Sequence, residues 1–211
     1  MEALGFPFTV RITDIDETPS SSETPARTVL RLSKEKTQAA AAQSTCGEEI
    51  IIAADTLVVC DGQIMGKPVG VDEATTMLQT LRGRWHEVMS GLTVLDEAAG
   101  RMVKFLSVTE VCMRDYVDAE IRKYVDSGEP YDKAGGYAIQ DGAFHPVSEV
   151  VGCYAGVVGF PLCHLGQALE DLGVALECEM VPTCADVTGQ VCDLASRLVG
   201  SPRHPGVPRN C

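Results

Sequence analysis

The chain has few basic residues and no long hydrophobic segment, and both shortages limit the classes of protein to which it can belong. Its 211 residues contain 17 lysines and arginines against 30 aspartates and glutamates, a formal net charge of −13. Proteins that bind nucleic-acid backbones need a basic face, although a few placed lysines can still hold a small anion. No segment approaches the length of a transmembrane helix. We therefore expect neither a nucleic acid nor a membrane as a partner.

Three further signals are missing from the sequence: a signal peptide, an internal repeat and a zinc module. Met1 is followed by Glu2, without a basic start or an apolar stretch, so we expect a cytoplasmic protein. The nine cysteines are an odd number and indicate a reducing compartment rather than a disulfide scaffold. Several stand singly in apolar segments, where a small buried hydrophobic residue is the usual role: Cys60, Cys112, Cys153 and Cys163.

Length and periodicity predict an α/β protein. A chain of this length suits one large domain or two small lobes. Apolar periodicity predicts strands at 6–12, 50–60, 86–95 and 102–113, one or two strands within 147–158, and helices at 26–44, 72–81, 118–127 and after Pro161. Alternating strands and helices are typical of α/β architecture. Beyond Val181 the pattern weakens, which predicts one domain over residues 1–180 and a partly disordered tail over 181–211.

The most informative stretch is the apolar run Ile50–Cys60, which is interrupted only at Asp55 and Thr56. Such runs are typical of strands buried on both faces. A carboxylate inside one is costly unless a cation, a lysine or its own protonation offsets the charge. Asp55 therefore needs a partner that the rest of the chain must supply.

The residues after this strand supply a lysine. Asp61-Gly62 is the strongest short signal for a two-residue β-turn, and such a turn pairs Cys60 with Gln63. The same register places Thr56 opposite Lys67, within reach of Asp55. A carboxylate, a hydroxyl and a lysine at one hairpin mouth favour a site for a metal-bound anion; the alternative is a structural ion pair within the sheet.

Three segments elsewhere carry further candidate residues. Lys36 shares the inward face of the helix predicted at 26–44, although it can also snorkel at the rim of that face. The acidic segment Asp14–Glu17 follows the first predicted strand, and taken alone such a segment is more often a solvated turn than a functional one. The glycine-rich segment 128–140 indicates a loop whose backbone approaches a neighbouring group closely. Gln140 at its end offers both a donor and an acceptor, which suits reading the edge of a base.

Taken together, these segments resemble the Maf family of nucleoside triphosphate pyrophosphatases over roughly residues 3–175. The matching segments are 14–18 (DIDET), 31–36 (RLSKEK), 53–58 (AADTLV), 66–68 (GKP), 83–86 (GRWH), 132–140 (DKAGGYAIQ) and 157–162 (VVGFPL). The set in this order is far more specific than any one of its members. The resemblance implies a two-lobed α/β fold in which helices flank a mixed sheet and a central cleft, as in the inosine triphosphate pyrophosphatases.

The resemblance also implies a role for four charged residues. Asp55 matches the family's catalytic acidic residue, taken as the proton acceptor, while Glu17, Lys36 and Lys67 match polar residues of the cleft. Carboxylates at Glu17 and Asp55 suit Mg²⁺ or Mn²⁺, which prefer oxygen ligands and substrate phosphates. The lysines supply point charges to the phosphates. The sequence leaves open whether Asp55 acts as base, as metal ligand or as both.

Two residues match positions that select the base. Thr56 directly after Asp55, together with Gln140, resembles the branch of the family that acts on dTTP and UTP. The implied reaction is hydrolysis of these nucleotides, and of modified pyrimidine nucleotides, to the monophosphate and pyrophosphate. A homodimer is left open.

One element of the family has no counterpart. The family begins with a strand and an S-x-S-P-R-R loop just before the segment that is here Met1–Gly5. The loop's arginine contacts substrate, so its absence favours a second hypothesis, a catalytically impaired nucleotide-binding or regulatory protein; a misplaced start codon is the simplest explanation. A third hypothesis, a general metal-dependent phosphatase, lacks the clustered aspartates or histidines of a two-metal site.

Overall fold

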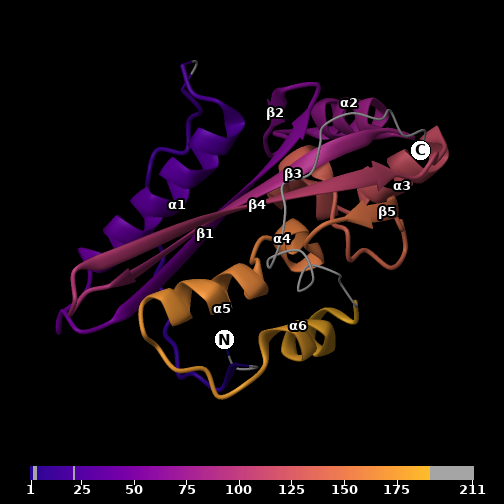
Figure 1. Cartoon of the computed structure of the whole chain (residues 1–211). Helices are drawn as coiled ribbons and strands as arrows, with labels where there is room; N and C mark the ends of the chain where they lie inside the picture. The colour runs from indigo at the N-terminus through magenta and orange to yellow at the C-terminus, as the bar shows by residue number, and fades with distance from the viewer. Residues whose placement is uncertain (2–3, 21, 191–211) are drawn as a thin grey trace.

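A single five-stranded sheet carries the fold, with helices against both of its faces (Figure 1). The computed structural model describes residues 1, 4–20 and 22–190. The strands are β1 (Ile50–Cys60), β2 (Gln63–Met65), β3 (Trp85–Asp96), β4 (Arg101–Met113) and β5 (Val147–Val151), in the order β2-β1-β3-β4-β5. The α-helices are α1 (Pro25–Ala41), α2 (Val71–Leu81), α3 (Asp118–Asp126), α4 (Tyr154–Val158), α5 (Leu162–Asp171) and α6 (Met180–Thr188). Two 3₁₀ turns, Glu129–Asp132 and Ala134–Gly136, lie between α3 and β5. None of the described helices is long and apolar enough to cross a membrane.

The sheet confirms the α/β class but differs from the expected mixed sheet. Each pairing within the described chain, β1 with β2 and β3, and β4 with β3 and β5, is antiparallel. Tight turns after Cys60 and Asp96 join two of these pairs directly, and only antiparallel neighbours can be joined by so short a connection. The helices predicted from the sequence are therefore insertions between antiparallel strands, not crossovers of a parallel sheet.

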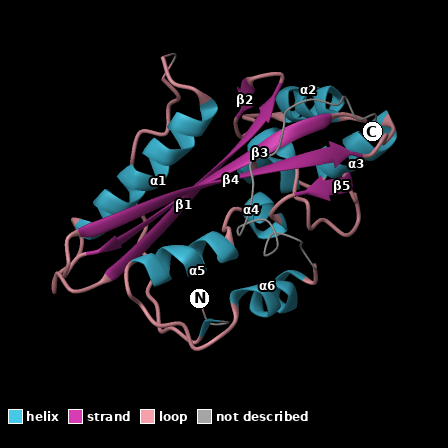
Figure 2. Ribbon diagram, in the orientation of Figure 1, coloured by secondary structure: helices cyan, strands magenta, loops and turns pink. Residues whose placement is uncertain are grey.

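Helix α1 covers one face of the sheet, whereas α2, α3, α4 and α5 lie on the other (Figure 2). Among the described residues, two hydrophobic clusters pack against the second face and a third lies between α4, α5 and α6. One gathers around Leu78, Tyr116 and Tyr124 near the β1–β2 hairpin, and the other joins Leu92 and Leu165 beneath α5. The long strands β1, β3 and β4 run through both clusters. One continuous sheet therefore supports both clusters.

The predicted hairpin is confirmed. Cys60 pairs with Gln63 and Val58 with Met65, which is the register that Asp61-Gly62 predicts. Both turn residues have positive φ, 51° at Asp61 and 76° at Gly62, as a type I′ turn requires. Strand β2 ends at Met65, so Lys67 lies two residues beyond the ladder rather than in it.

Two predicted segments differ from the structure. Phe6–Ile12 forms no strand; Val10 and Ile12 are 81% and 90% exposed, so its alternating pattern lacks a buried face. Residues 154–158, expected as strand, form α4; the Cys153 side chain caps its start and Gly159, with φ of +112°, ends it in the left-handed region. The expected tail begins with α6, whose Met180 and Cys184 pack near α5. Residues 191–211, including the rest of that tail, lie outside the described residues.

Close packing of α1 on the sheet depends on Gly91. A Cβ atom at this position would lie 2.5 Å from the carbonyl oxygen of Val29. Nearby, Ser33 Oγ lies 2.9 Å from Thr93 Oγ1, so α1 and β3 also share a buried hydrogen bond. Gly91 pairs with Asp55 across β1 and β3. This close contact between the helix and the sheet therefore lies beside Asp55.

We predict that Gly91→Ala lowers the free energy of unfolding by about 1–3 kcal/mol, because the added methyl group must displace backbone. Denaturant unfolding measures the change. Gly142→Ala is the matched control, since a Cβ atom there meets nothing within 4 Å. Equal unfolding midpoints for the two variants would contradict this account of the helix–sheet contact.

Candidate active site

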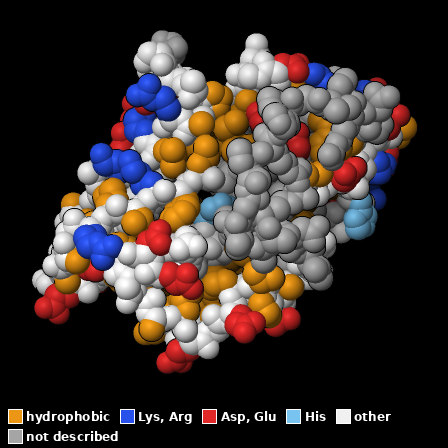
Figure 3. All heavy atoms as spheres, in the orientation of Figure 1, with side chains coloured by type: hydrophobic (Ala, Val, Ile, Leu, Met, Phe, Trp, Pro, Cys, Tyr) orange, Lys and Arg blue, Asp and Glu red, His pale blue; other side chains and the backbone are white. Residues whose placement is uncertain are grey.

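A cavity of about 590 Å³ lies against β1 and is lined by all six residues that the sequence singles out: Glu17, Lys36, Asp55, Thr56, Lys67 and Gln140. Ligand cavities commonly span about 300–1,000 Å³. In Figure 3, lysine and arginine side chains gather over α1, whereas acidic ones lie over α5 and α6. The structure thus brings the predicted residues together; the roles given to them remain predictions.

The cavity lies at an open edge of β1. Strand β2 pairs only with Val58–Cys60, and among the described residues no strand pairs with Ile50–Leu57 on that side. Successive side chains of a strand point to opposite faces. Asp55 therefore lies on the face that carries α1, and Thr56 on the face that carries α4. Because the edge between them is open, a ligand can reach both.

Lys36 joins the two predicted carboxylates. Its Nζ lies 2.6 Å from Asp55 Oδ1 and 2.6 Å from Glu17 Oε1. The Asp55 side chain is 9% exposed, whereas that of Glu17 is 51% exposed. Lys36 is therefore no snorkelling lysine: it extends from α1 to offset the charge of a buried carboxylate.

The three groups differ in how burial acts on them. Burial raises the pKa of Asp55 and outweighs the hydrogen bond and charge of Lys36, which lower it. Burial also opposes the charge of Lys36, but its hydrogen bonds to Asp55 and Glu17 prevail and raise the pKa of the lysine. The hydrogen bond from Lys36 lowers the pKa of Glu17. Asp55 is thus the carboxylate that binds a proton more readily than usual, as a general base needs.

Glu17 stands on a loop that α1 holds in place. The Asp16 carboxylate accepts a hydrogen bond from the backbone N–H of Thr18 at 2.9 Å, and Arg31 donates to the Thr18 carbonyl at 3.2 Å. The first contact sets a local turn and the second ties that turn to the helix carrying Lys36. The acidic segment is therefore an anchored turn rather than a freely solvated one.

Lys67 and the glycine-rich loop meet beyond the end of β2. Gly135 donates its N–H to the carbonyl of Gly66 at 2.9 Å. Gly135 has φ of +71°, and a Cβ atom there would lie 2.9 Å from Val58 Cγ1. The glycine thus lets the loop rest on β1 beside Lys67, and Gln140 on the same loop reaches the cavity.

Sequence reasoning named the segment of Asp132 and Lys133 but assigned neither residue to the site. Both line the cavity. Lys133 Nζ lies 2.5 Å from Asp132 Oδ1 and donates to the Glu129 carbonyl at 3.1 Å. Their hydrogen bond lowers the pKa of Asp132, and the charge of Lys67 adds a smaller lowering. Both residues belong to the glycine-rich loop, and this position is the sequence signal that could have assigned them to the site.

Comparison with known proteins identifies the family. The model of the family described as "Maf-like protein" matches residues 1–172. The chain is 40% identical over 176 residues to a protein of Desulforamulus reducens, covering 83% of this chain and 91% of that protein. It is 43% identical over 174 residues to a protein of Geobacter sp. strain M21, covering 82% and 89%. Both relatives are named dTTP/UTP pyrophosphatase. The chain belongs to the Maf-like family.

The metal-ligating groups of this Maf-like site suit a cation that is bound partly by the phosphates of the substrate. Within the described part of the chain, no group of three or more histidines, cysteines, aspartates or glutamates could hold a metal ion. Glu17 and Asp55 offer two carboxylates on one cavity. Mg²⁺ commonly binds through one or two carboxylates plus substrate phosphates. The donor set fits that mode rather than a cage built from protein alone.

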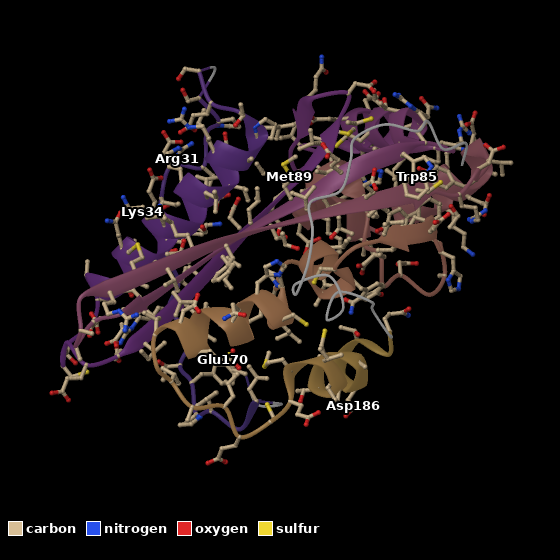
Figure 4. All side chains as sticks on the ribbon, viewed as in Figure 1. Arg31, Lys34, Trp85, Met89, Glu170 and Asp186 are labelled. Atoms are coloured by element: carbon tan, nitrogen blue, oxygen red, sulfur yellow. The ribbon has the colours of Figure 1, made fainter. Side chains whose placement is uncertain are left out.

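We predict that Lys36→Met raises the pKa of Asp55 further, because the lysine's hydrogen bond and charge lower it while burial raises it. NMR titration of the Asp55 carboxyl carbon measures the shift. Lys34→Met is the matched control, since Lys34 stands on the same helix but points away from the sheet (Figure 4). A fall in the pKa, or the same shift in both variants, would show that Lys36 does not act on Asp55 as described.

Proposed function

We propose that this Maf-like protein hydrolyses dTTP and UTP to the nucleoside monophosphate and pyrophosphate. The observation that carries the proposal is the convergence of Glu17, Lys36, Asp55 and Lys67 with Thr56 and Gln140 on one cavity. Family membership and the printed names of its relatives support the same reaction. The cavity also has room for a nucleotide.

The charges of the cavity suit a triphosphate better than the chain's overall charge suggests. Three lysines, Lys36, Lys67 and Lys133, line the cavity. Lysine ammonium groups act as point charges toward phosphate oxygens. Charge placed in advance at the reacting phosphate stabilises the transition state without reorganisation. A few placed lysines thus suffice in a protein whose net charge is −13.

In the proposed reaction, Asp55 accepts a proton from the attacking water. The water oxygen forms a bond to the α-phosphorus, the bond from that phosphorus to the α–β bridging oxygen breaks, and pyrophosphate leaves. Lys36 orients the Asp55 carboxylate through its 2.6 Å contact, and Lys67 holds departing phosphate oxygens. When bound, a divalent cation held by Glu17, Asp55 and the phosphates supplies further positive charge to the leaving group. A positioned base contributes about 10²–10⁴-fold, so the rest must come from electrostatics.

The base is proposed to lie toward Thr56 and Gln140. Gln140 is exposed at the cavity, and no hydrogen bond of its side chain is recorded with any described residue. Its amide can pair with a carbonyl and an N–H on the edge of uracil or thymine. A site built to form such bonds leaves its own groups unpaired when the wrong base enters, which can reject that base strongly.

We predict that the protein releases pyrophosphate, not orthophosphate, from dTTP and UTP, and that Asp55→Asn lowers kcat by at least about 10²-fold, because asparagine cannot accept the proton. Separate assays for the two products, with and without EDTA, make the measurement, and we expect loss of turnover in chelator. Asp61→Asn on the same hairpin is the control and should keep its rate, because its side chain is 73% exposed and asparagine suits the turn.

Three results would count against the proposal. Orthophosphate as the first product would indicate a general phosphatase. Nucleotide binding without any turnover would indicate a regulatory protein. An Asp55→Asn variant that keeps more than about a tenth of the rate would remove Asp55 from the role of base.

We also predict that Gln140→Ala reduces the preference for dTTP and UTP over ATP and GTP by roughly tenfold, the effect of about 1.4 kcal/mol in lost hydrogen bonding. Comparison of kcat/KM across the four nucleotides measures it. Gln63→Ala on β2 is the control, because Gln63 lies outside the cavity lining. An unchanged ranking in Gln140→Ala, or a wild type that favours purines, would defeat this role.

A further inference from the structure

A buried histidine and a buried tyrosine join the sheet to the glycine-rich loop, and neither has a part in the reaction described above. His86 Nε2 on β3 lies 2.7 Å from the hydroxyl oxygen of Tyr137, and the two rings meet edge to face with their centroids 5.5 Å apart. His86 is 4% exposed and Tyr137 is 5% exposed. Tyr137 lines the cavity, whereas His86 does not. The tyrosine therefore connects the wall of the cavity to the interior of the sheet.

The contact is a hydrogen bond between neutral groups at neutral pH. Burial lowers the pKa of His86 to about 4 and raises the pKa of Tyr137, so neither side chain carries a charge. A neutral hydrogen bond adds little net stability, since two apolar side chains of the same shape can replace such a pair at little cost. What apolar side chains cannot replace is its direction. The bond forms only where the tyrosine hydroxyl meets the histidine nitrogen.

The glycine-rich loop needs such a directional contact because its backbone has unusual freedom. Residues 135–136 are both glycine, with φ of 71° and 69°, and glycine adopts positive φ about as readily as negative φ. Tyr137 follows them directly, and Ala138 then donates its N–H to the hydroxyl of Tyr124 at 3.0 Å. Contacts to two tyrosine hydroxyls thus hold the loop just before Gln140.

The position of Gln140 depends on these contacts. Its side chain is exposed at the cavity and makes no recorded hydrogen bond to a described residue, so nothing fixes it directly. Its place follows from the backbone, which Tyr137 anchors three residues earlier. Hydrogen bonds of amides form over donor–acceptor distances of about 2.7–3.2 Å. A small displacement of the loop therefore takes the amide out of reach of a base edge.

We propose that His86 is a positioning residue for the reaction: through its hydrogen bond to Tyr137 it fixes the glycine-rich loop so that Gln140 faces the base of the bound nucleotide. The inference rests on the proposed function for the contact between Gln140 and the base. It gives the buried pair an effect on nucleotide preference, which a contact that serves only the hydrophobic core would not have.

The first measurement needs no nucleotide. Hydrogen exchange of the backbone amides of residues 138–140 is compared in wild type, Tyr137→Phe and Tyr116→Phe. Each substitution removes one buried phenol oxygen. Tyr116 is the matched control, because its hydroxyl donates to the carbonyl of Leu78 at 2.7 Å in the same hydrophobic cluster but lies outside the cavity lining.

We expect these amides to exchange roughly five- to tenfold faster in Tyr137→Phe, the effect of losing one buried hydrogen bond that holds the loop. Tyr116→Phe should leave their exchange unchanged. Equal exchange rates in the two variants would overturn the inference, because the loop would then not depend on the bond to His86.

The second measurement reads nucleotide preference apart from turnover. Calorimetry with the non-hydrolysable α,β-methylene analogues of UTP and GTP gives the ratio of their dissociation constants in wild type, His86→Leu and His86→Gln. Leucine removes the hydrogen bond, whereas the amide of glutamine can form one with the phenol. We expect His86→Leu to lose roughly five- to tenfold of the preference for the UTP analogue, and His86→Gln to keep most of it. Loss of stability alone would weaken both analogues alike, and an unchanged ratio would overturn the inference.

A double variant tests whether His86 acts through Gln140. In a protein that carries Gln140→Ala, His86→Leu should change the ratio no further, because both substitutions remove the same contact to the base. Losses of preference that add up in the double variant would contradict the inference.

If His86→Leu does not fold, Tyr137→Phe decides in the same calorimetry, because it removes a single oxygen atom and keeps the ring. A preserved ratio in that variant contradicts the inference. A reduced ratio in a protein without turnover supports the inference and counts against the proposed reaction. Normal turnover with an unchanged ratio does the reverse, and a wild type that binds neither analogue contradicts both.

Discussion

The buried ion pair between Lys36 and Asp55 is the constraint on which the rest of the site depends. An ionised carboxylate with 9% of its side chain exposed is costly in a strand unless a cation reaches it. That cation comes from α1, so α1 must lie close to the sheet, and Gly91 makes room for it opposite Asp55. Glu17 shares the same ammonium, which ties the N-terminal loop to the arrangement. The need of Asp55 for a cation thus accounts for the position of α1, for the glycine at position 91 and for the placement of the loop that carries Glu17.

The open edge of β1 explains how one strand serves two purposes. Neighbouring residues of a strand point to opposite faces, so Asp55 joins the charged groups beneath α1 and Thr56 joins the hydroxyl and carbonyl groups beneath α4. In a fully paired strand, the neighbouring backbone would separate these environments. Because β2 pairs only with Val58–Cys60, a nucleotide can lie across the edge, with its phosphates toward one face and its base toward the other.

Much of this site could be predicted from the sequence, and the reasons are local. Asp61-Gly62 specifies a turn whose geometry sets the register, and helical spacing places Lys36 on the inward face. Whether the strands pair parallel or antiparallel could not be predicted in this way, because side chains alternate between the two faces in both kinds of sheet. Helix α4 is too short for a helical period to appear.

The three lysines of the cavity are not equivalent toward an incoming anion. Lys36 and Lys133 each hold carboxylates within hydrogen-bond distance, so a phosphate must compete with those partners. For Lys67 no hydrogen bond or ion pair is recorded within the described residues, and its side chain is exposed at the cavity. Its charge acts on Glu17, Asp55 and Asp132 from a distance. Lys67 is thus the cavity lysine that no described carboxylate holds within hydrogen-bond distance. The carboxylates of Glu17, Asp55 and Asp132 balance the formal charges of the three lysines that line the cavity.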